Sequence, residues 1–286
     1  MISVIIPTYN REKTIERAIK SVINQENDLN NKYDLEIIIV DDCSSDNTLK
    51  VVKSMDNDSI KIIALESNVG ANNARNIGIK YANGDYIAFQ DSDDEWIPGK
   101  LNKQLSIFKQ TNSDLVFTNF IRKNEFQKTE GKLTSKVKSG FISFDYFSTN
   151  PLMSTQTILV KKEVIKDNLF LEGLPRLQDW ELSLRLSKLG YNCFFLEDIL
   201  VNQYVQSNSI SNNGYAAEQA IEIISNEFKE QFQNKKVRIH AYRLLAESTS
   251  DENKKKHFYN EILKISFDFK LFIKLKLIKL GSRGNK

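Results

Sequence analysis

Three carboxylates stand within four residues at positions 91–94, where the sequence reads Asp-Ser-Asp-Asp directly after an apolar run. Carboxylates this close together raise one another's pKa, because each negative charge disfavours the next. A hard divalent cation removes this repulsion, and Mg²⁺ held by one or two carboxylates commonly completes its coordination with substrate phosphates. The cluster is therefore a candidate site for a divalent cation and a phosphorylated ligand. A solvated acidic turn that caps the next helix is the alternative.

Three further groups have side chains that can act on a ligand. Asp41 and Asp42 follow another apolar run, where a carboxylate can accept a hydrogen bond from a nucleobase N–H or a ribose hydroxyl, or else cap a helix. Tyr9 offers a ring that can stack on a nucleobase, although packing is the commoner role. Asp179 opens a predicted helix, where an acid favours the helix dipole; its chemical alternative is a general base.

Other chemistries lack their motifs in this chain. The first predicted strand is not followed by GxGxxG, and no GxxxxGKS/T sequence is present, so the usual dinucleotide and P-loop sites are not expected. His240 and His257 have no metal-ligand spacing, and Cys43 and Cys193 form no CxxC pattern, so we expect ordinary histidines and two reduced thiols. A net charge of +3 is too small to indicate a dedicated nucleic-acid binder.

Alternating strands and helices must position the polar groups of the first ninety-odd residues. Short apolar runs predict strands at residues 2–6, 35–40, 60–65 and 86–89. Amphipathic or capped segments predict helices at residues 14–25, 45–55 and 72–82. This alternation indicates a parallel sheet with helices on both faces, in which ligands bind beyond the carboxyl ends of the strands. The polar clusters that end the first, second and fourth strands should therefore converge on one edge.

The rest of the chain is less regular. Further strands are predicted at residues 114–120 and 156–160, with a polar, Lys-rich loop or exposed hairpin between them, and a helix is predicted at 178–189. From about residue 216 the pattern is helical nearly to the end. Four aromatic residues in this half are candidates for stacking on a sugar, although packing is commoner for such side chains: Trp96, Tyr146, Phe147 and Trp180.

Taken in order, five segments resemble glycosyltransferase family 2, a family of inverting enzymes with the GT-A fold that includes many enzymes of bacterial surface-polysaccharide assembly. They are VIIPTYN at 4–10, IVDDCSSD at 39–46, NVG and ARNIG within 68–78, GDYIAFQDSDD at 84–94 and RLQDWEL at 176–182. The resemblance implies an α/β fold with a Rossmann-like, mostly parallel sheet and flanking helices. It implies a catalytic domain at 1–212, with a nucleotide-binding half at 1–95 and an acceptor half at 96–212. A C-terminal helical region would follow at 213–286.

The resemblance also implies roles for single residues. The nucleotide-binding residues would be Pro7, Thr8, Tyr9, Asp42, Arg75, Asp91 and Ser92. Asp91 and Asp93 would bind Mn²⁺ or Mg²⁺, and Asp179 would be the general base that deprotonates the acceptor. The expected reaction moves one sugar, with inversion, from a nucleotide-sugar donor to a hydroxyl of a glycan or lipid-linked acceptor. A UDP-sugar is the expected donor, because the Asp42 carboxylate can accept the N3–H of uracil.

Two departures from the family pattern and two alternative functions remain. Cys43 stands where the family usually has glycine, and residues 204–211 lack the histidine that would supply a third metal ligand. A sugar-nucleotide nucleotidyltransferase would need a Gly-rich, Arg-containing loop after the first strand, which residues 7–12 do not supply. A catalytically inactive nucleotide-sugar-binding protein would be expected to have lost a key aspartate, whereas Asp91, Asp93 and Asp179 are all present.

The ends of the chain bear on its location. No secretion signal precedes the first strand, and no apolar run approaches the roughly 18 residues that a membrane span needs, so we expect a cytoplasmic protein. Residues 268–286 hold six Lys or Arg against one Asp, interleaved with apolar residues. Such a segment can lie on an anionic inner-leaflet surface as a peripheral membrane contact. A terminal helix packed on the body of the protein is the alternative.

Overall fold

A computed structural model of the chain describes residues 1–25, 34–123, 129–132, 137–205, 214–268, 270–272 and 275. It divides the chain into two compact units. The first contains Met1–Phe147, Pro151–Gly173 and Gln178–Gln206, and the second contains Ser148–Asn150, Leu174–Leu177 and Ser207–Lys286. The predicted boundary near residue 212 lies outside the described residues and stays a prediction.

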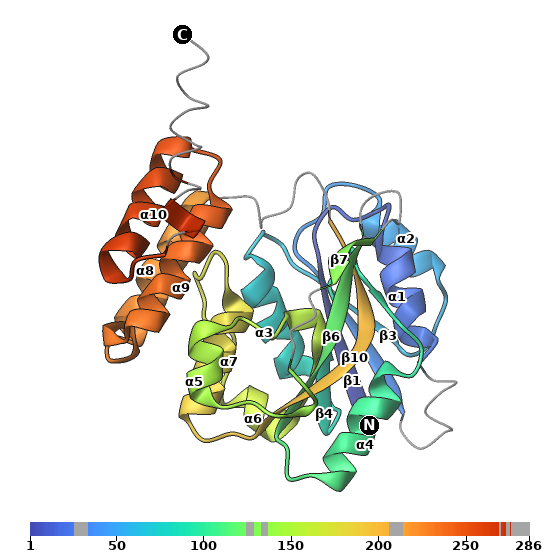
Figure 1. Cartoon of the computed structure of the whole chain (residues 1–286). Coiled ribbons are helices and arrows are strands. Elements are labelled where there is room, and N and C mark those ends of the chain that lie inside the picture. The colour runs from blue at the N-terminus through green and yellow to red at the C-terminus, as the bar shows by residue number, and fades with distance from the viewer. Residues whose placement is uncertain are drawn as a thin grey trace. The chain divides into compact units, whose positions relative to one another are not determined.

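The first unit is built on one sheet, which among the described residues has ten strands in the order β3-β2-β1-β4-β9-β6-β10-β5, with β7 beside β6 and β8 beside β10 (Figure 1). The strands of the first half are β1 (Ile2–Thr8), β2 (Leu35–Asp41), β3 (Ile60–Ala64), β4 (Tyr86–Phe89) and β5 (Glu95–Trp96). Those of the second half are β6 (Leu115–Lys123), β7 (Thr129–Lys132), β8 (Gly140–Phe141), β9 (Ile158–Lys161) and β10 (Cys193–Tyr204).

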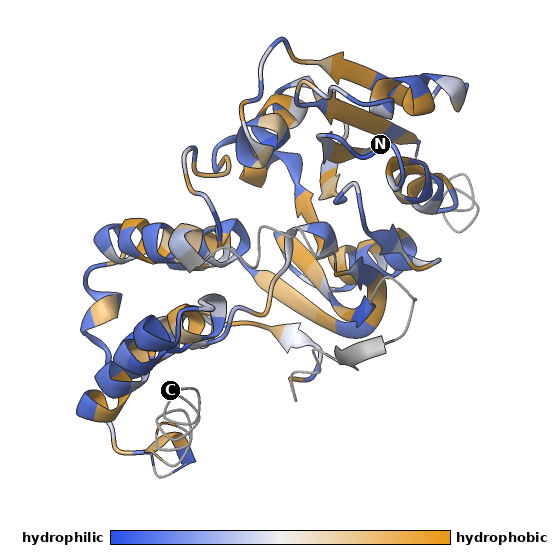
Figure 2. Cartoon of the chain, turned by 90° about the horizontal axis from the view of Figure 1, so that it is seen from above, coloured by the Kyte–Doolittle hydropathy of each residue, from blue (hydrophilic) through white to orange (hydrophobic). Residues whose placement is uncertain are grey.

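The helices that precede the C-terminal region are α1 (Ile15–Ile23), α2 (Thr48–Ser54), α3 (Ala71–Tyr81), α4 (Lys100–Gln110), α5 (Phe144–Thr149), α6 (Lys162–Lys166) and α7 (Gln178–Lys188), with a 3₁₀ turn, η2, at Thr155–Thr157. Every residue of β1 and β2 is buried, as expected for strands covered on both faces. Figure 2 shows mostly hydrophobic strands, whereas the helices mix hydrophobic and hydrophilic residues. The predicted α/β fold with flanking helices is confirmed.

The sheet is mostly parallel, as the resemblance implied, rather than parallel throughout. β3, β2, β1 and β4 run parallel to one another, and β6 runs parallel to β10. β9 lies between the two groups and is antiparallel to both of its neighbours, β4 and β6. The sequence could not reveal this direction, because a strand buried on both faces reads as the same apolar run whichever way it points.

Pro7 lies inside β1, although the sequence predicted that the strand would stop before it. β4 ends at Phe89, opposite Ile5, and the N–H of Gln90 donates to the Ile5 carbonyl. Beyond that point β1 pairs only with β2, where the N–H of Asp42 donates to the Thr8 carbonyl at 2.8 Å. Proline is tolerated here because no ladder bond on the β4 side requires its missing N–H.

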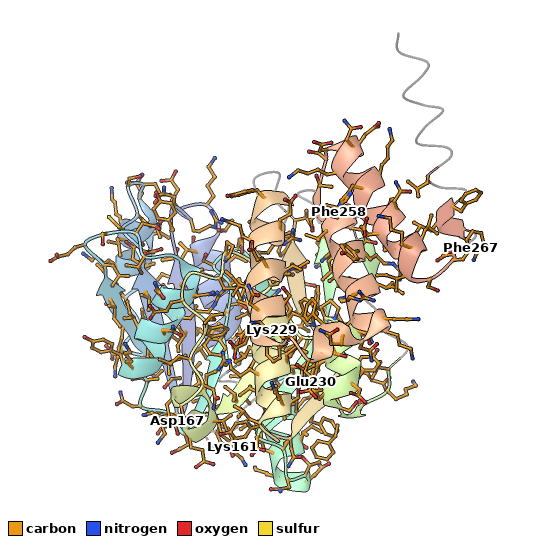
Figure 3. All side chains as sticks on the ribbon, turned by 90° about the vertical axis from the view of Figure 1, so that its left-hand side faces the viewer. Lys161, Asp167, Lys229, Glu230, Phe258 and Phe267 are labelled. Carbon is orange, nitrogen blue, oxygen red and sulfur yellow. The ribbon has the colours of Figure 1, made fainter. Side chains whose placement is uncertain are left out.

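The second unit is helical, as the sequence predicted. Its helices in the described residues are α8 (Gly214–Glu227), α9 (Lys235–Ser248) and α10 (Glu252–Ile265), with a 3₁₀ turn, η4, at Gln231–Gln233. Asn234 and Asp251 cap α9 and α10 by accepting hydrogen bonds from backbone N–H groups. Figure 3 labels Phe258 on α10, which is buried, and Phe267 beyond its end, which is exposed. The predicted membrane-contact segment lies largely outside the described residues.

Candidate active site

The ends of β1 and β2 are interlocked by side chain-to-backbone hydrogen bonds. Asn10 accepts from the N–H of Ser45 at 2.8 Å, and its own N–H donates to the Ser44 hydroxyl at 2.9 Å. The N–H of Arg11 donates to the Thr48 hydroxyl at 2.7 Å. The clusters that follow the first and second strands therefore form one structured edge, as their position at the carboxyl ends of parallel strands predicted.

Two non-glycine residues at this edge, Asn10 and Cys43, have left-handed backbone conformations. Among the described residues, the non-glycine residues with positive φ are Asn10, Cys43, Asp56 and Leu177. Cys43 has a φ of 66°, directly after Asp42, and Leu177 has a φ of 64°, two residues before Asp179. Such conformations cost free energy for side chains other than glycine and concentrate at functional sites. The glycine usual in the family at the position of Cys43 therefore has a physical reason.

Two oxygen atoms are buried at this edge. Thr8 and Asp41 are register partners on the adjacent parallel strands β1 and β2, and both residues are almost inaccessible. Thr8 Oγ1 and Asp41 Oδ1 have no hydrogen-bond partner among the described residues. Buried polar groups are nearly always paired, so a hydrogen-bonding group of a ligand or a water would be favourable at this position. The neighbouring Tyr9 is 47% exposed, which leaves its ring available for stacking.

Both carboxylate oxygens of Asp42 already accept hydrogen bonds within the protein, which the sequence did not indicate. Its Oδ1 accepts from the N–H of Val69 at 2.6 Å, and its Oδ2 accepts from the N–H of Gly70 at 2.9 Å. Both donors belong to the loop that begins α3, and Asp42 itself is buried. The carboxylate thus fixes this loop. Its predicted contact with the nucleobase would use lone pairs that these two bonds leave over.

The acidic turn at 91–94 meets two arginines. Arg75, on α3, is buried and donates from Nη2 to Asp91 Oδ1 at 2.8 Å, while its Nε has no partner among the described residues. Arg11 Nη2 lies 3.6 Å from Asp93 Oδ2. The carboxylates of Asp91 and Asp93 remain 27% and 24% exposed. Arg75 therefore pairs directly with Asp91, and its contact with the nucleotide stays a prediction.

The other two residues of the turn are buried. Ser92 is nearly inaccessible, and Asp94 is inaccessible apart from 2% of its surface. Asp94 Oδ1 accepts from the N–H of Tyr204 at 2.8 Å, which ties the turn to the end of β10. Burial, with the charges of Asp93 and Asp91, raises the pKa of Asp94 well above its usual range. Asp94 therefore holds the turn against β10 and does not face solvent.

Asp91 and Asp93 have the donor chemistry that a hard divalent cation requires. Burial and the neighbouring charge of Asp91 raise the pKa of Asp93, so positive charge at this point would be favourable. Within the described ranges, no group of three His, Cys, Asp or Glu side chains is arranged to hold a metal ion. Two carboxylates supplemented by phosphate oxygens and water match the usual coordination of Mg²⁺. Residues 204–211, which lack the histidine that would supply a third ligand, lie mostly outside the described residues.

Asp179 lies at the start of α7, and the charges of the acidic turn and its arginine affect the pKa of its carboxyl group. Burial raises the pKa of Asp179 to about 6, against hydrogen bonds that lower it, including one from the N–H of Trp180. The charge of Asp91 also raises this pKa and the charge of Arg75 lowers it, so both groups are near. The structure thus brings together residues that the sequence predicted as metal ligand, nucleotide contact and base.

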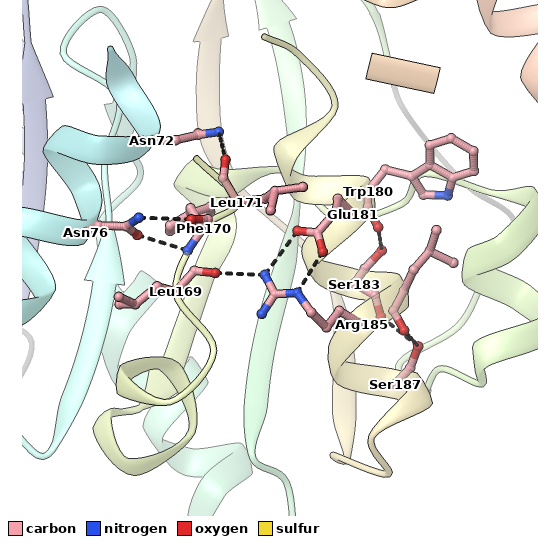
Figure 4. A network of polar contacts seen from close by, with 11 residues as sticks. Asn72, Asn76, Leu169, Phe170, Leu171, Trp180, Glu181, Ser183, Arg185 and Ser187 are labelled. Carbon is pink, nitrogen blue, oxygen red and sulfur yellow. Dashed lines mark hydrogen bonds and ion pairs between the residues drawn. The ribbon is translucent and has the colours of Figure 1, made fainter. Parts of the chain in front are cut away.

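Asparagines on α3 hold the segment that precedes α7, and sequence reasoning missed them. Asn76 and the backbone of Phe170 exchange two hydrogen bonds, each of 2.9 Å, and Asn72 Nδ2 donates to the carbonyl of Leu171 at 3.1 Å (Figure 4). The Phe170 ring lies 5.6 Å from the guanidinium carbon of Arg75. Because the partners are backbone groups more than ninety residues away, no local pattern could have indicated these roles.

Arg185, on α7, also binds the segment at residues 169–171. Arg185 donates from Nε and Nη2 to the two oxygens of Glu181 at 2.7 and 3.0 Å, and also from Nη2 to the carbonyl of Leu169 at 2.8 Å (Figure 4). Glu181 is buried, so the pair is largely shielded from solvent. Residues 169–171 therefore connect α3, which carries Arg75, to α7, which begins with Asp179.

The aromatic residues considered for sugar stacking are mostly core residues. Trp96, Phe147 and Trp180 are buried. The indole N–H of Trp96 donates to the carbonyl of Gln156 at 3.0 Å, and that of Trp180 donates to the carbonyl of Phe147 at 2.8 Å. The two indoles satisfy their N–H groups inside the protein and the Phe147 ring is buried, so all three are packing residues. Tyr146 is partly exposed.

A cavity of about 470 Å³ lies along α1. Its lining residues are Lys13, Glu16, Arg17, Lys20, Ser21, Asn24, Glu95, Trp96 and Pro98. It borders the acidic turn through Glu95 but includes none of Tyr9, Asp42 or Asp179. The cavity is therefore separate from the predicted nucleotide contacts.

Known proteins provide close comparisons. The Glycosyl transferase family 2 profile matches residues 3–169. The chain is 32% identical over 219 residues to the Escherichia coli UDP-Glc:alpha-D-GlcNAc-diphosphoundecaprenol beta-1,3-glucosyltransferase WfgD, a match that covers 75% of this chain and 81% of WfgD.

Solved structures share the fold at low sequence identity. The S. aureus TarS crystal structure in complex with UDP-GlcNAc aligns with a TM-score of 0.61 at 22% identity, covering 94% of this chain and 73% of TarS. The mannosyltransferase PcManGT from Pyrobaculum calidifontis, in complex with GDP-Man and Mn²⁺, aligns with a TM-score of 0.61 at 13% identity, covering 99% and 79%. With the family profile spanning more than half of the sequence, the chain belongs to glycosyltransferase family 2 and is a glycosyltransferase enzyme with a GT-A-type fold.

Proposed function

We propose that this enzyme transfers one sugar from a UDP-sugar to a hydroxyl of a glycan or lipid-linked acceptor, with inversion at the anomeric carbon. One observation carries the proposal. The charge of Asp91, in the acidic turn, contributes to raising the pKa of Asp179, the candidate base, although the sequence separates the two residues widely. A base beside a diphosphate-binding turn is the arrangement that a single displacement needs.

Asp179 is suited to remove the acceptor's proton. With its pKa raised to about 6, most of its carboxyl group is ionised at neutral pH, yet it is more basic than an ordinary aspartate. General bases work best when their pKa is near the operating pH, and a positioned base contributes roughly 10²–10⁴ in rate. As the acceptor oxygen attacks the anomeric carbon, the proton passes to the carboxylate and the nucleoside diphosphate departs.

The donor's nucleotide would lie over the ends of β1 and β2. Tyr9 has an accessible ring, and Thr8 and Asp41 have buried oxygens that find no partner in the part of the chain that the structure describes. A ribose hydroxyl or a base N–H could satisfy such atoms. Pro7 and Asp42 would shape this edge, the former from within β1 and the latter by fixing the loop before α3.

Asp91 and Asp93 would hold Mn²⁺ or Mg²⁺ on the donor's diphosphate. A bound cation neutralises charge on a departing phosphate group. Arg11 and Arg75 add positive charge from the protein itself, 3.6 and 2.8 Å from these carboxylates. Ser92 lies between Asp91 and Asp93 in the sequence, and its buried side chain would support the turn.

The names of the compared proteins favour this donor and acceptor. WfgD is named for UDP-Glc and for a diphosphoundecaprenol-linked sugar, and TarS binds UDP-GlcNAc. PcManGT holds GDP-Man with Mn²⁺, which makes GDP the nucleotide to compare with UDP. A lipid-linked acceptor would bring the enzyme to the inner leaflet, where residues 268–286 could make a peripheral contact.

The test is a transfer assay with a panel of UDP-, GDP- and dTDP-sugars and diphospholipid-linked sugar acceptors, with Mn²⁺ or with EDTA. We expect a UDP-sugar to react in Mn²⁺, a product of inverted anomeric configuration by NMR, and almost no activity for Asp93→Asn. Asp85→Asn, which alters an exposed carboxylate at the other end of β4, is the matched control. Nucleotide-sugar binding without transfer would favour the inactive binding protein, and sugar-nucleotide synthesis would favour the nucleotidyltransferase.

A further inference from the structure

Arg17 on α1 and Tyr204 at the end of β10 meet beside the acidic turn. The guanidinium carbon of Arg17 lies 3.8 Å from the centre of the Tyr204 ring. Arg17 also donates a hydrogen bond from Nη2 to the backbone carbonyl of Asp93. A guanidinium stacked on an aromatic face is held by electrostatic attraction and keeps a defined plane, so the donor to Asp93 has a fixed direction.

Tyr204 holds the two residues that follow Asp93. Its backbone N–H donates to Asp94 Oδ1 at 2.8 Å, and its hydroxyl donates to Glu95 Oε2 at 3.0 Å. Glu95 Oε2 also accepts from Asn202 Nδ2 at 2.9 Å. Three consecutive residues, 93–95, are thus tied to one stacked pair, while Asp91 is tied separately to Arg75.

We propose that Arg17 and Tyr204 are positioning residues that hold Asp93 next to Asp91, so that the two carboxylates meet the donor's diphosphate and its cation in one conformation. The inference rests on the proposed role of Asp91 and Asp93. Two like charges would separate if the turn were free to move. A turn that is ordered on folding does not have to be ordered again on binding, which strengthens affinity, and residues that orient metal ligands commonly matter 10–100-fold.

If the pair positions Asp93, replacing either residue should affect two binding constants differently. We would measure, by calorimetry on the full chain, the affinity for UDP with Mn²⁺ and the affinity for UDP in EDTA. Arg17→Met and Tyr204→Leu should weaken the Mn²⁺-dependent binding by roughly tenfold or more. Binding in EDTA should change by less than about twofold, because the nucleoside contacts at Thr8 and Tyr9 are not altered.

Related variants sharpen the result. Tyr204→Phe keeps the ring that stacks on Arg17, which Tyr204→Leu removes, and should therefore have the smaller effect. In the double variant, the two losses should be less than additive, because both residues act on one turn. Lys20→Met, an exposed position on the same helix, is the matched control and should bind like the wild type. If Arg17→Met does not fold, Arg17→Lys, which keeps the charge but loses the planar fork, should show the same separation.

Two outcomes would overturn the inference. Variants that bind Mn²⁺ and UDP as tightly as the wild type would show that the pair does not position the turn. Equal losses with Mn²⁺ and with EDTA would show a general structural role. If instead the wild-type protein binds UDP equally well with and without Mn²⁺, the proposed function itself is contradicted, and this inference with it.

Discussion

The carboxyl group of Asp179 has surroundings that shift its titration toward neutral pH. As a base it must be ionised, and it becomes protonated as the pH falls through its pKa of about 6. We therefore predict that kcat/KM, which reports the free enzyme, is level near neutral pH and falls about tenfold per unit below about pH 6. A pH–rate profile between about pH 5 and about pH 8 is the measurement.

Replacing the base should separate catalysis from binding. Asp179→Asn should lower kcat by roughly 10²–10⁴ and leave donor affinity nearly unchanged, because the proposed role of this side chain is toward the acceptor and not toward the nucleotide. Asp85→Asn should keep both the rate and the pH profile. Collapse of donor affinity in Asp179→Asn, or a wild-type profile without an acidic limb, would mean that the base lies elsewhere.

Cys43 has a backbone conformation that suits glycine. At a φ of 66°, a side chain costs about 1 kcal/mol or more, whereas glycine adopts this region freely. Glycine also gains entropy in the unfolded chain, which offsets part of the benefit. We predict that Cys43→Gly raises the free energy of unfolding by up to about 1 kcal/mol in urea titrations. Cys43→Ser, with the same backbone requirement, should match the wild type; a glycine variant less stable than the serine variant would disprove the strain.

At the scale of elements, the site depends on how α3 and α7 are joined. Asn76 pairs with both backbone groups of Phe170, and Arg185 binds the adjacent carbonyl of Leu169. Through these contacts, the helix that carries Arg75 and the helix that begins with Asp179 share one connecting segment. Neither helix could shift without breaking hydrogen bonds inside the protein.

Asn76→Ala should disturb this connection. It leaves a buried N–H and a buried carbonyl of Phe170 unpaired, which costs about 1–3 kcal/mol of stability. We expect kcat to fall further than KM rises, because Asp179 would be displaced while the predicted nucleotide contacts on β1, Thr8 and Tyr9, would not. Asn73→Ala is the control on the same helix, since Asn73 bonds only locally to Val69 in the described structure. Equal behaviour of the two variants would contradict the connection.

At the scale of the whole molecule, the chain combines a catalytic fold with a helical C-terminal unit. No helix in the described part of the chain is both long enough and apolar enough to cross a membrane. A lipid-linked acceptor would nevertheless require the enzyme to work at a membrane surface. The basic and apolar residues of 268–286 are the candidate contact, with each basic charge adding about 1 kcal/mol or less.

Co-sedimentation with vesicles tests this contact. We predict that the full chain binds vesicles rich in anionic lipid at low salt, and that a chain ending at Ser266 binds much less. Added salt should weaken the binding, because it screens the charges. Neutral vesicles are the control. Equal binding of both chains, or none by either, would exclude the tail as the membrane contact.

Much of the fold could be predicted from the sequence, because the evidence for it is local. Short apolar runs marked the strands from β1 to β4, and helical periodicity marked α1, α3 and α7 to within a few residues. The same order placed the aspartates at 41–42 and 91–94 beyond strand ends. Pro7 was wrongly taken as a strand end, since only the length of β4 reveals that its missing N–H is not needed there.

Tertiary structure alone decided which residues act on one another. It paired Arg75 with Asp91 and Arg17 with Asp93, and it buried Trp96, Phe147 and Trp180 in the core. It also set the antiparallel direction of β9. The physical reason is the separation along the chain between the groups that interact. Strand and helix patterns come from neighbours in the chain, whereas burial, pKa shifts and hydrogen-bond partners depend on groups that meet only when the whole sheet and its helices have packed.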